Sequence, residues 1–473
     1  MAFQSDVEFQ WGDDAELIEL LRVLIRIPSV NPPRPEMPDG ELVAARFLAD
    51  VLAAEGIPST VVEPFPGRGS IVARVRGDGT GGDAMLLLSH LDVVPADPAG
   101  WSHEPFAADL EDGYVYGRGT IDMKSMVAME VQLMRRLARA ARAAGLDPAT
   151  DPIPGLKRDV IFCCAADEEA GGFQGANWIV NEHPDWLRAA AAVNEAGGVE
   201  MAYGGTSFYP IQVAEKGLAV YRIRVHGRWG HASMPGDENA AVMAAEIITR
   251  LSEPGPVRLV PALTASFEQA IPHLPAKPAA ALRAIVSGDA EPSTVDAALR
   301  ELCDPVMARA ISAVTRNTLS VGIVRAGLKY NVIPGVAELE VDCRTLPGTT
   351  EPEMFAEIRA RIGEALWSHV EIERLAVGVA VEAPLDGELY GLIEQVVRDH
   401  DPAAVPLPFV APFATDAKHL ARIGVPVYGF SPLRLGDDKF LALMHATDER
   451  VHVEALSFGL PVLWDLVSRF CSH

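Results

Sequence analysis

The sequence predicts an α/β protein with a mostly parallel central sheet, interrupted by an inserted α+β domain. In residues 1–214, apolar strand-like runs alternate with stretches of helical spacing, which is the order typical of a buried parallel sheet. In residues 215–379 the strand-like runs alternate apolar and polar residues, as half-exposed strands do. The buried pattern returns in residues 380–473, which we expect to complete the first domain. A chain of 473 residues is also too long for one ordinary core.

Each element of the first domain follows from spacing. Apolar residues three and four apart predict helices over 14–26, 41–55, 123–144, 173–180 and 452–470. Apolar runs predict strands over 59–62, 71–76, 85–94, 159–165, 190–194 and 425–430. The glycine-rich segment 77–82 fits no phosphate-binding loop and predicts a hairpin turn between two of these strands. Loops at the carboxyl ends of such strands usually hold the site.

The inserted domain begins with an alternating run, LAVYRIRV at 218–225, and further strands are predicted at 318–324 and 337–343. Helices are predicted over 239–252 and 352–367. Residues 253–316 are rich in Pro and Ala, with helical pieces. Their apolar residues are candidates to line a pocket for an acyl chain, with core packing as the default explanation: Leu259, Val260, Leu263, Phe267 and Leu274.

Composition excludes some partners. The formal charge of −25 predicts a protein that binds neither nucleic acid nor anionic membranes. Five irregularly spaced cysteines without a CxxC pair suggest neither a disulfide framework nor a thiolate metal site. The start, MAFQSDVEFQ, has no basic or apolar region of a signal peptide, and no apolar run is long enough for a membrane span. We therefore expect a cytoplasmic protein.

Four segments place ligand-type residues beside small ones. In LLLSHLDVVP, His90 and Asp92 are two apart on a strand, so their side chains share a face, although a buried structural His is the alternative. In GRGTIDMKSM, Asp122 precedes a helix, where it is either a helix cap or a residue projecting into the site. Apolar strands also run into acids in FCCAADEEAGG, with Glu168 and Glu169, and in AAAVNEAGG, with Glu195.

The acidic pair has a chemical interpretation. One of two adjacent carboxylates can bind a metal while the other takes a proton from metal-bound water. A solvated acidic loop is the alternative. Three repetitions of an apolar run, a ligand-type residue and small residues favour a site, because independent loops are not expected to repeat this arrangement.

These segments, in this order, resemble the M20 metallopeptidase family. The similarity covers nearly the whole chain through SHLDVVP, GRGTIDMK, DEEAGG, NEAGG, GRWGHASMP and MHATDE. YGFSPL, HATDERV and the long 253–316 stretch resemble the carboxypeptidase S and N-acyl-amino-acid hydrolase branch. The resemblance implies a zinc-peptidase-like catalytic domain with an inserted lid or dimerisation domain, and a homodimer is expected on the same ground.

The resemblance also implies a centre of two zinc ions per chain, with cobalt or manganese fitting similar ligands. His90 and Glu195 would bind one ion, Glu169 and His445 the other, and Asp122 would bridge them. Asp92 would orient His90, and Glu168 would be the general acid and base. Two such cations can polarise a carbonyl and lower the pKa of water toward about 7.

Further residues match family positions that contact substrate. His231 would stabilise an oxyanion, and Arg344 would pair with a substrate carboxylate, with an ion pair inside the domain as the alternative for Arg344. Asn239, which is otherwise a helix cap, and Asn331 also match. In PFATD, Thr415 is kept, but Ala414 stands where relatives commonly have Gly.

The expected activity is hydrolysis of an amide bond in N-acyl amino acids or at a peptide C-terminus. Relatives with Glu at position 195 mostly cleave amides of carboxylate-bearing amino acids, whereas dipeptidase branches usually carry Asp. A dipeptidase or a desuccinylase-type deacylase on the same metals is the alternative. A binding module without catalysis is a third hypothesis, but such relatives usually lose ligands that this chain keeps.

Overall fold

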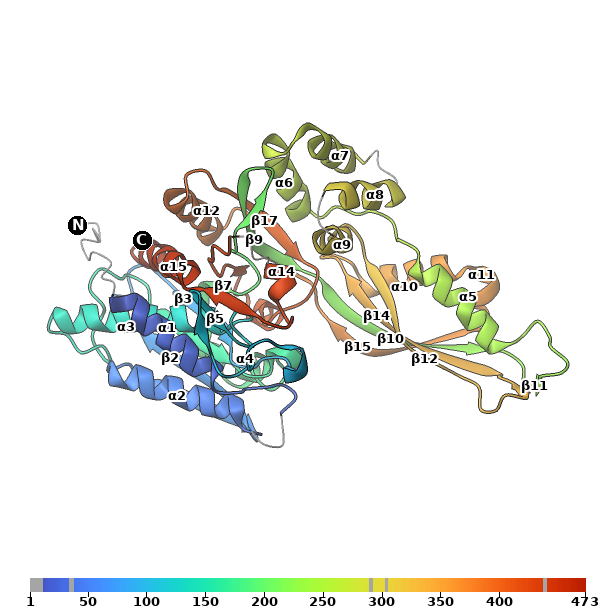
Figure 1. The fold of residues 1–473 in the computed structure, drawn as a ribbon, viewed down its shortest axis with the longest axis horizontal. Helices are drawn as coiled ribbons and strands as arrows, with labels where there is room; N and C mark the ends of the chain where they lie inside the picture. Colours follow the sequence, from blue (N-terminus) through green and yellow to red (C-terminus); the bar gives the residue numbers. More distant parts are fainter. Residues whose placement is uncertain (1–11, 34–37, 289–291, 303–304, 437–439) are drawn as a thin grey trace. The chain divides into compact units, whose positions relative to one another are not determined.

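The computed structural model describes residues 12–33, 38–288, 292–302, 305–436 and 440–473 (Figure 1). The chain forms two compact units. The first comprises Met1–Val213, Ala383–Phe409 and Thr415–His473, and the second comprises Ala214–Glu382 and Val410–Ala414. We propose that these are the domains expected at 1–214 with 380–473 and at 215–379. The first eleven residues, on which the expectation of no signal peptide rests, lie outside the described residues.

The first unit is built on a large mixed sheet whose centre is parallel, as the sequence predicts. Its strands follow the order β1-β2-β6-β3-β7-β18-β9, and both β8 and β17 pair with β9. The β6–β3, β3–β7 and β7–β18 pairs are parallel. The bounds are Ser59–Phe65 (β1), Arg68–Val75 (β2), Ala84–His90 (β3), Val160–Ala165 (β6), Ala189–Asn194 (β7), Met201–Tyr203 (β8), Thr206–Glu215 (β9), Val405–Ala411 (β17) and Val427–Gly429 (β18).

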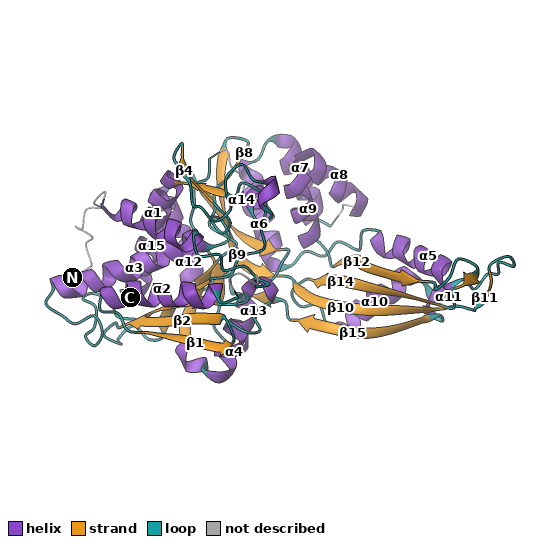
Figure 2. Ribbon diagram, turned by 60° about the horizontal axis from the view of Figure 1, so that its bottom comes forward, coloured by secondary structure: helices purple, strands orange, loops and turns teal. Residues whose placement is uncertain are grey.

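Helices cover both faces of this sheet (Figures 1 and 2). Helices α1, α3 and α15 pack against one another, and α3 and α15 also contact β3. Residues of α4 and α13 pack with Leu86, Leu88 and Ile161 of β3 and β6. Every residue of β3 and β6 is buried, which explains their uninterrupted apolar runs. The helices are Gly12–Ile25 (α1), Gly40–Ala54 (α2), Lys124–Ala143 (α3), Ala176–Glu182 (α4), Glu388–His400 (α12), Ala417–Leu420 (α13), Phe440–Leu443 (α14) and Val453–Cys471 (α15).

The predicted hairpin at 77–82 is wrong. The segment does connect β2 to β3, but β6 lies between these strands and pairs with both. The glycines therefore serve a crossing connection, and Gly79 and Gly82 have φ of +79° and +94°. A small sheet that the sequence did not predict consists of β4 (Leu110–Glu111), β5 (Tyr114–Tyr116) and β19 (Arg450–His452).

The second unit is an antiparallel sheet with helices, as predicted for the insert (Figure 2). Its main sheet has the order β12-β14-β10-β15. The strands are Gly217–His226 (β10), Gly230–His231 (β11), Thr318–Ala326 (β12), Val332–Ile333 (β13), Val336–Thr345 (β14), Val370–Gly378 (β15) and Val381–Glu382 (β16). The helices are Ala240–Ser252 (α5), Pro261–Ala270 (α6), Ala276–Val286 (α7), Pro292–Leu302 (α8), Pro305–Val314 (α9), Glu351–Ile362 (α10) and Glu364–Trp367 (α11).

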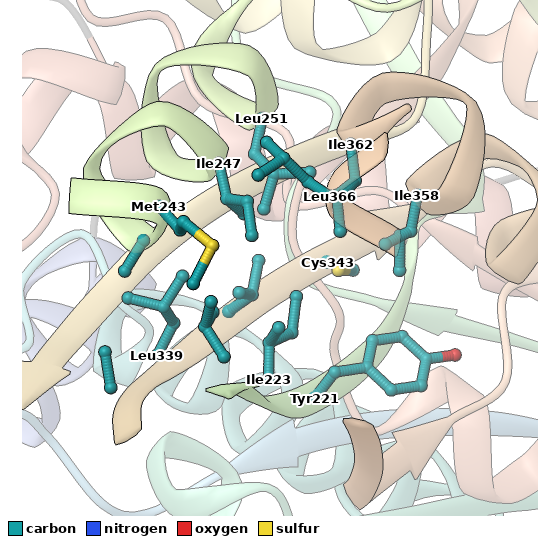
Figure 3. Packing of buried hydrophobic residues seen from close by; sticks show 14 of the residues in the cluster. Tyr221, Ile223, Met243, Ile247, Leu251, Leu339, Cys343, Ile358, Ile362 and Leu366 are labelled. Carbon is teal, nitrogen blue, oxygen red and sulfur yellow. The ribbon is translucent and has the colours of Figure 1, made fainter. Parts of the chain in front are cut away.

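One face of this sheet forms the core of the second unit (Figure 3). Tyr221 and Ile223 of β10 and Leu339 of β14 pack against Ile247 of α5 and Ile358 of α10. The residues between them face outward and form ion pairs, such as Arg222 with Glu340 at 3.1 Å. This alternation is the pattern read in LAVYRIRV.

The insert residues considered for an acyl pocket are partly explained by packing. Val260, Leu263 and Phe267 are each at most 5% exposed and lie at or within α6. Core packing thus accounts for these three residues. Among the described residues, no helix combines the length and the apolar character that crossing a membrane requires.

Candidate metal centre

Three predicted ligands lie at one edge of the sheet in the first unit. His90 is the last residue of β3, Glu195 follows β7 directly, and Glu169 follows β6 after a short turn. Because β6, β3 and β7 are adjacent and parallel, their carboxyl ends meet at this edge. The repeated pattern in the sequence therefore corresponds to a convergence of side chains in space.

Asp122 lies between the two histidines. Its Oδ1 is 3.1 Å from Nε2 of His90, and its Oδ2 is 3.1 Å from Nε2 of His445. The residue that caps α3 is Met123, so the helix-cap alternative for Asp122 is wrong. Each oxygen of this carboxylate faces a different imidazole, which is the arrangement that a bridging ligand requires.

The other two carboxylates complete two groups of ligand atoms. Glu195 Oε2 lies 3.6 Å from Nε2 of His90, and Glu169 Oε1 lies 3.3 Å from Nε2 of His445. Ligand atoms of His90, Asp122 and Glu169 lie within 4.8 Å of one another. Those of His90, Glu195 and Glu168 do so as well, which brings Glu168 to the same place.

The donor set fits a pair of divalent cations. Imidazole nitrogens and carboxylate oxygens are the ligands that zinc and similar ions prefer. Oε1 of Glu169 is buried and receives no hydrogen bond from the described part of the chain. The backbone is also strained here, because Asp167, Ala196 and His445 have φ of +70°, +70° and +62°. Such strain costs about 1–3 kcal/mol per residue and clusters at functional sites.

The electrostatics of the centre favour a bound cation. Burial, followed by the negative charge of Glu195, raises the pKa of Glu168 well above its ordinary value. Burial raises the pKa of Glu195 to about 7. The carboxylates of Asp122 and Glu169, which lie 3.1 and 3.3 Å from its Nε2, raise the pKa of His445 to about 10. Neighbouring carboxylates contribute to each of these three shifts, and bound divalent cations would neutralise that negative charge.

Asp92 contacts His90, as the sequence suggested, and it also binds the main chain of the turn that carries Glu168 and Glu169. The Nδ1 of His90 lies 3.0 Å from the main-chain oxygen of Asp92 and 3.5 Å from its Oδ1. The Asp92 carboxylate also accepts hydrogen bonds from the main-chain nitrogens of Glu168 and Glu169, each at 3.0 Å. Because β3 ends at His90, Asp92 is in a loop, and strand alternation did not anticipate its contact with the acidic turn.

Sequence reasoning missed the pair of Arg118 and Glu449. Arg118 pairs with Oε2 of Glu449 at 2.5 Å and donates to the main-chain oxygen of His445 at 3.1 Å. Oε1 of Glu449 accepts hydrogen bonds from the main-chain nitrogens of Gly119, Ile121 and Asp122. The pair thus joins the segments that carry Asp122 and His445. Both residues stand inside the quoted motifs, but nothing in their spacing distinguishes them from surface charges.

The predicted substrate residues divide between the units. Thr415 is in the first unit, where its Oγ1 accepts a hydrogen bond from Asn194, the residue before Glu195, at 3.1 Å. His231, Asn239, Asn331 and Arg344 belong to the second unit.

Within the second unit, His231 and Asn331 lie close together. His231 is exposed in β11, and the main-chain nitrogen of Ala232 donates to the main-chain oxygen of Asn331 at 3.1 Å. Asn239 caps α5 through Ala241, and Arg344 pairs with Asp342 at 2.8 Å, as their structural alternatives predicted. Substrate roles for these residues stay predictions.

Comparisons with known proteins agree with this geometry. The description "Peptidase family M20/M25/M40" belongs to a family model that matches residues 86–469. An N-fatty-acyl-amino acid synthase/hydrolase of Xenopus tropicalis is 27% identical over 93% of this chain and 83% of its own length. Human aminoacylase-1 is 25% identical over 96% of this chain and 95% of its own.

Solved structures share the fold. An M20 family metallo-carboxypeptidase of Sulfolobus solfataricus aligns over 96% of this chain and 99% of its own, with a TM-score of 0.67 and 17% identity. Human carnosine dipeptidase 1 aligns over 97% of both chains, with a TM-score of 0.65 and 17% identity.

Proposed function

Because the chain belongs to peptidase family M20/M25/M40 and is therefore a hydrolase of C–N amide bonds, we propose that it hydrolyses N-acyl amino acids or the C-terminal bond of short peptides. The observation that carries the proposal is Asp122, with one carboxylate oxygen on each of two histidines. Two similar relatives, an N-fatty-acyl-amino acid synthase/hydrolase and an aminoacylase, support the substrate class. Glu at position 195 supports it as well.

Five side chains would hold the cations: His90, Asp122, Glu169, Glu195 and His445. Bound divalent cations supply Lewis acidity, which polarises a carbonyl and lowers the pKa of water. We propose zinc, because imidazole and carboxylate ligands suit it, and cobalt or manganese fits similar ligands.

Glu168 would move the proton. It is positioned beside His90 and Glu195, and the raised pKa that burial gives it favours a carboxyl group that can take up a proton and give it back. It would accept a proton from the attacking water and deliver it to the leaving nitrogen. The C–N bond breaks, a C–O bond forms, and the products are a carboxylic acid and an amine. Asp92 would keep His90 in its ligand orientation.

The second unit would supply the substrate contacts. Arg344 would exchange Asp342 for the substrate carboxylate, and His231 would stabilise the developing oxyanion. Asn239, Asn331 and Thr415 would contact the substrate. We also propose a homodimer, on the family resemblance, and a cytoplasmic location, on the irregular cysteine spacing.

The proposal is tested by offering the metal-loaded enzyme a panel of N-acyl amino acids, with acyl chains of increasing length, together with dipeptides. We expect release of the free amino acid from the N-acyl substrates. Glu168→Gln should lower kcat about 10²–10⁴-fold, the usual contribution of a general base. Glu182→Gln, at an exposed position on α4, is the matched control and should retain full activity.

Two results would contradict the proposal. If the metal-loaded enzyme cleaves only substrates with a free α-amino group, the dipeptidase alternative takes its place. If Glu168→Gln retains the wild-type kcat, Glu168 does not move the proton.

A further inference from the structure

The segment Ser29–Asn31 is held beside the loop that carries Asp92. The main-chain nitrogen of Asn31 donates to the oxygen of Val93, and that of Val93 donates to Ser29, each at 2.9 Å. The Ser29 hydroxyl donates to the main-chain oxygen of Leu91 at 2.6 Å. These contacts fix the position of Asn31, which is 4% exposed and belongs to no motif described above.

The Asn31 side chain completes the hydrogen bonds of Asp92. Its Nδ2 donates to Oδ2 of Asp92 at 2.8 Å, and the same oxygen accepts the main-chain N–H of Glu169 at 3.0 Å. The other oxygen, Oδ1, accepts the main-chain N–H of Glu168 at 3.0 Å and lies 3.5 Å from Nδ1 of His90. Asp92 is fully buried, so its orientation depends on these donors.

The amide of Asn31 has one permitted orientation. Its Oδ1 accepts a hydrogen bond from Nη2 of Arg68 at 2.8 Å, and its Nδ2 also reaches Oδ1 of Asp167 at 3.3 Å. A rotated amide would direct its N–H groups at the guanidinium and its oxygen at two carboxylates. Arg68 is held in turn by a 2.5 Å ion pair with the buried Glu41.

The neutrality of the amide matters for His90. An arginine or lysine at this position would hold Asp92 but would also compensate its charge. An amide holds the carboxylate and leaves its negative charge for the imidazole. The guanidinium of Arg68 is already paired with Glu41 and lies 3.7 Å from Oδ1 of Asp167, and Oε1 of Glu41 also accepts the main-chain N–H of Asp167 at 2.8 Å.

We infer that Asn31 is a positioning residue of the metal centre, which acts through Asp92 on His90 and on the Glu168–Glu169 turn. It touches neither the cations nor the substrate. The inference rests on the proposed function, because it assumes that His90 and Glu169 bind cations. Substitution of a residue that orients a metal ligand typically lowers metal affinity or activity by about 10–100-fold.

The test compares Asn31→Asp and Asn31→Ser with the wild type. Aspartate keeps the size but removes both donors and adds a charge beside two carboxylates, whereas serine keeps a single short donor. The matched control is Asn181→Asp on α4, an exposed asparagine that accepts a hydrogen bond from Arg422. For each protein, zinc affinity is measured by competition with a chelator, kcat and KM are measured separately, and thermal unfolding is followed with and without zinc.

We expect Asn31→Asp to weaken zinc binding and to lower kcat, each by about 10–100-fold, with KM changed by less than about threefold. Asn31→Ser should lie between it and the wild type, and Asn181→Asp should match the wild type. A wild-type zinc affinity and kcat in Asn31→Ser would overturn the inference, even if Asn31→Asp failed to fold. A lower unfolding temperature with unchanged zinc affinity and kcat would also overturn it, because that is the result of a purely structural role.

The wild-type measurements separate the two proposals. If wild-type protein binds no zinc or cleaves no amide, the proposed function fails. If wild-type protein does both and the Asn31 variants behave like it, only the role of Asn31 fails.

Discussion

At the scale of single residues, Asp122 is the side chain on which the proposed centre depends most. It is 8% exposed, and each of its oxygens lies 3.1 Å from a different imidazole. Burial by itself would raise the pKa of Asp122, but the hydrogen bonds to His445 and His90 lower it, so the carboxylate stays ionised. An amide at this position would offer one acceptor oxygen instead of two.

Gly172 is predicted to be intolerant of a side chain. A Cβ there would lie 2.1 Å from Oδ1 of the buried Asp416, and φ is +73°. Gly145 has a similar φ of +77°, but a Cβ there would have no atom within 4 Å. Gly145→Ala therefore measures the cost of the backbone conformation alone. Gly145→Ala should cost about 1 kcal/mol, and Gly172→Ala about 2–4 kcal/mol because overpacking adds to that strain. Urea unfolding measures both, and equal costs would show that Asp416 moves away freely.

Glu130 makes stability depend on pH. Burial raises its pKa to about 8, and its Oε2 accepts the Ser89 hydroxyl at 2.6 Å. Between about pH 4.5 and 8 the folded chain therefore holds a proton that the unfolded chain has released, so stability from this group decreases as pH rises through that window. Each tenfold difference in proton affinity between the folded and the unfolded state changes the free energy of unfolding by about 1.4 kcal/mol. Glu130→Gln keeps the acceptor without the titration.

The measurement is urea unfolding of wild type and Glu130→Gln at intervals from pH 5 to pH 9. The variant should become progressively more stable than the wild type toward pH 9, by several kcal/mol at the upper end. Parallel pH profiles would show that Glu130 does not hold the proton.

At the scale of elements, the proposed centre depends on two loops, one carrying Asp122 and the other His445, which Arg118 and Glu449 join. The ion pair between Arg118 and Glu449 is buried, and Glu449 also accepts hydrogen bonds from three main-chain N–H groups in the segment before α3. Removing one partner of a buried pair leaves the other charge uncompensated. The loops that present Asp122 and His445 therefore share one stabilising contact.

Glu449→Gln is expected to lower the free energy of unfolding by about 3–5 kcal/mol, because Arg118 then remains buried without its counter-charge. Glu454→Gln, whose side chain is 87% exposed, is the matched control and should change it by less than about 0.5 kcal/mol. Chemical unfolding measures both. A small effect of Glu449→Gln would mean that the Gln amide and water satisfy Arg118.

The elements also show what the sequence could and could not predict. The apolar runs predicted as strands over 85–94, 159–165 and 190–194 correspond to β3, β6 and β7, because strands buried on both faces leave a clear pattern. The first prediction ran four residues too far, since β3 ends at His90. The turn at 77–82 was misassigned because strand order is set by long-range pairing, and β6 comes from a distant part of the chain.

The sequence pattern also could not predict the contacts that support the proposed ligands. Asn31 meets Asp92 across 61 residues, and Glu449 meets Arg118 across 331. No periodicity encodes such distances. The short strands β4, β5 and β19 were missed because two or three residues give no measurable alternation. The family resemblance, and not spacing, identified His445.

At the scale of the whole molecule, the proposed ligands all lie in the first unit, while the second unit has its own core. Removal of cations should therefore destabilise the first unit. A cation present at about 100 times its dissociation constant stabilises the folded protein by about 2.7 kcal/mol, and chelation removes this stabilisation. Hydrogen exchange should show lower protection after chelation in the segments around His90, Asp122 and Glu169, with β10 and β14 unchanged. An equal loss of hydrogen-exchange protection in both units would contradict a metal site confined to the first unit.

The central claim is a centre of two cations bridged by Asp122, and the most direct test is calorimetric titration of metal-free protein with Zn²⁺. Wild-type chain should bind two ions at the centre, and Asp122→Asn should lose at least one of them while remaining folded. One ion or none in the wild type, or two ions bound with unchanged affinity in Asp122→Asn, would contradict the account.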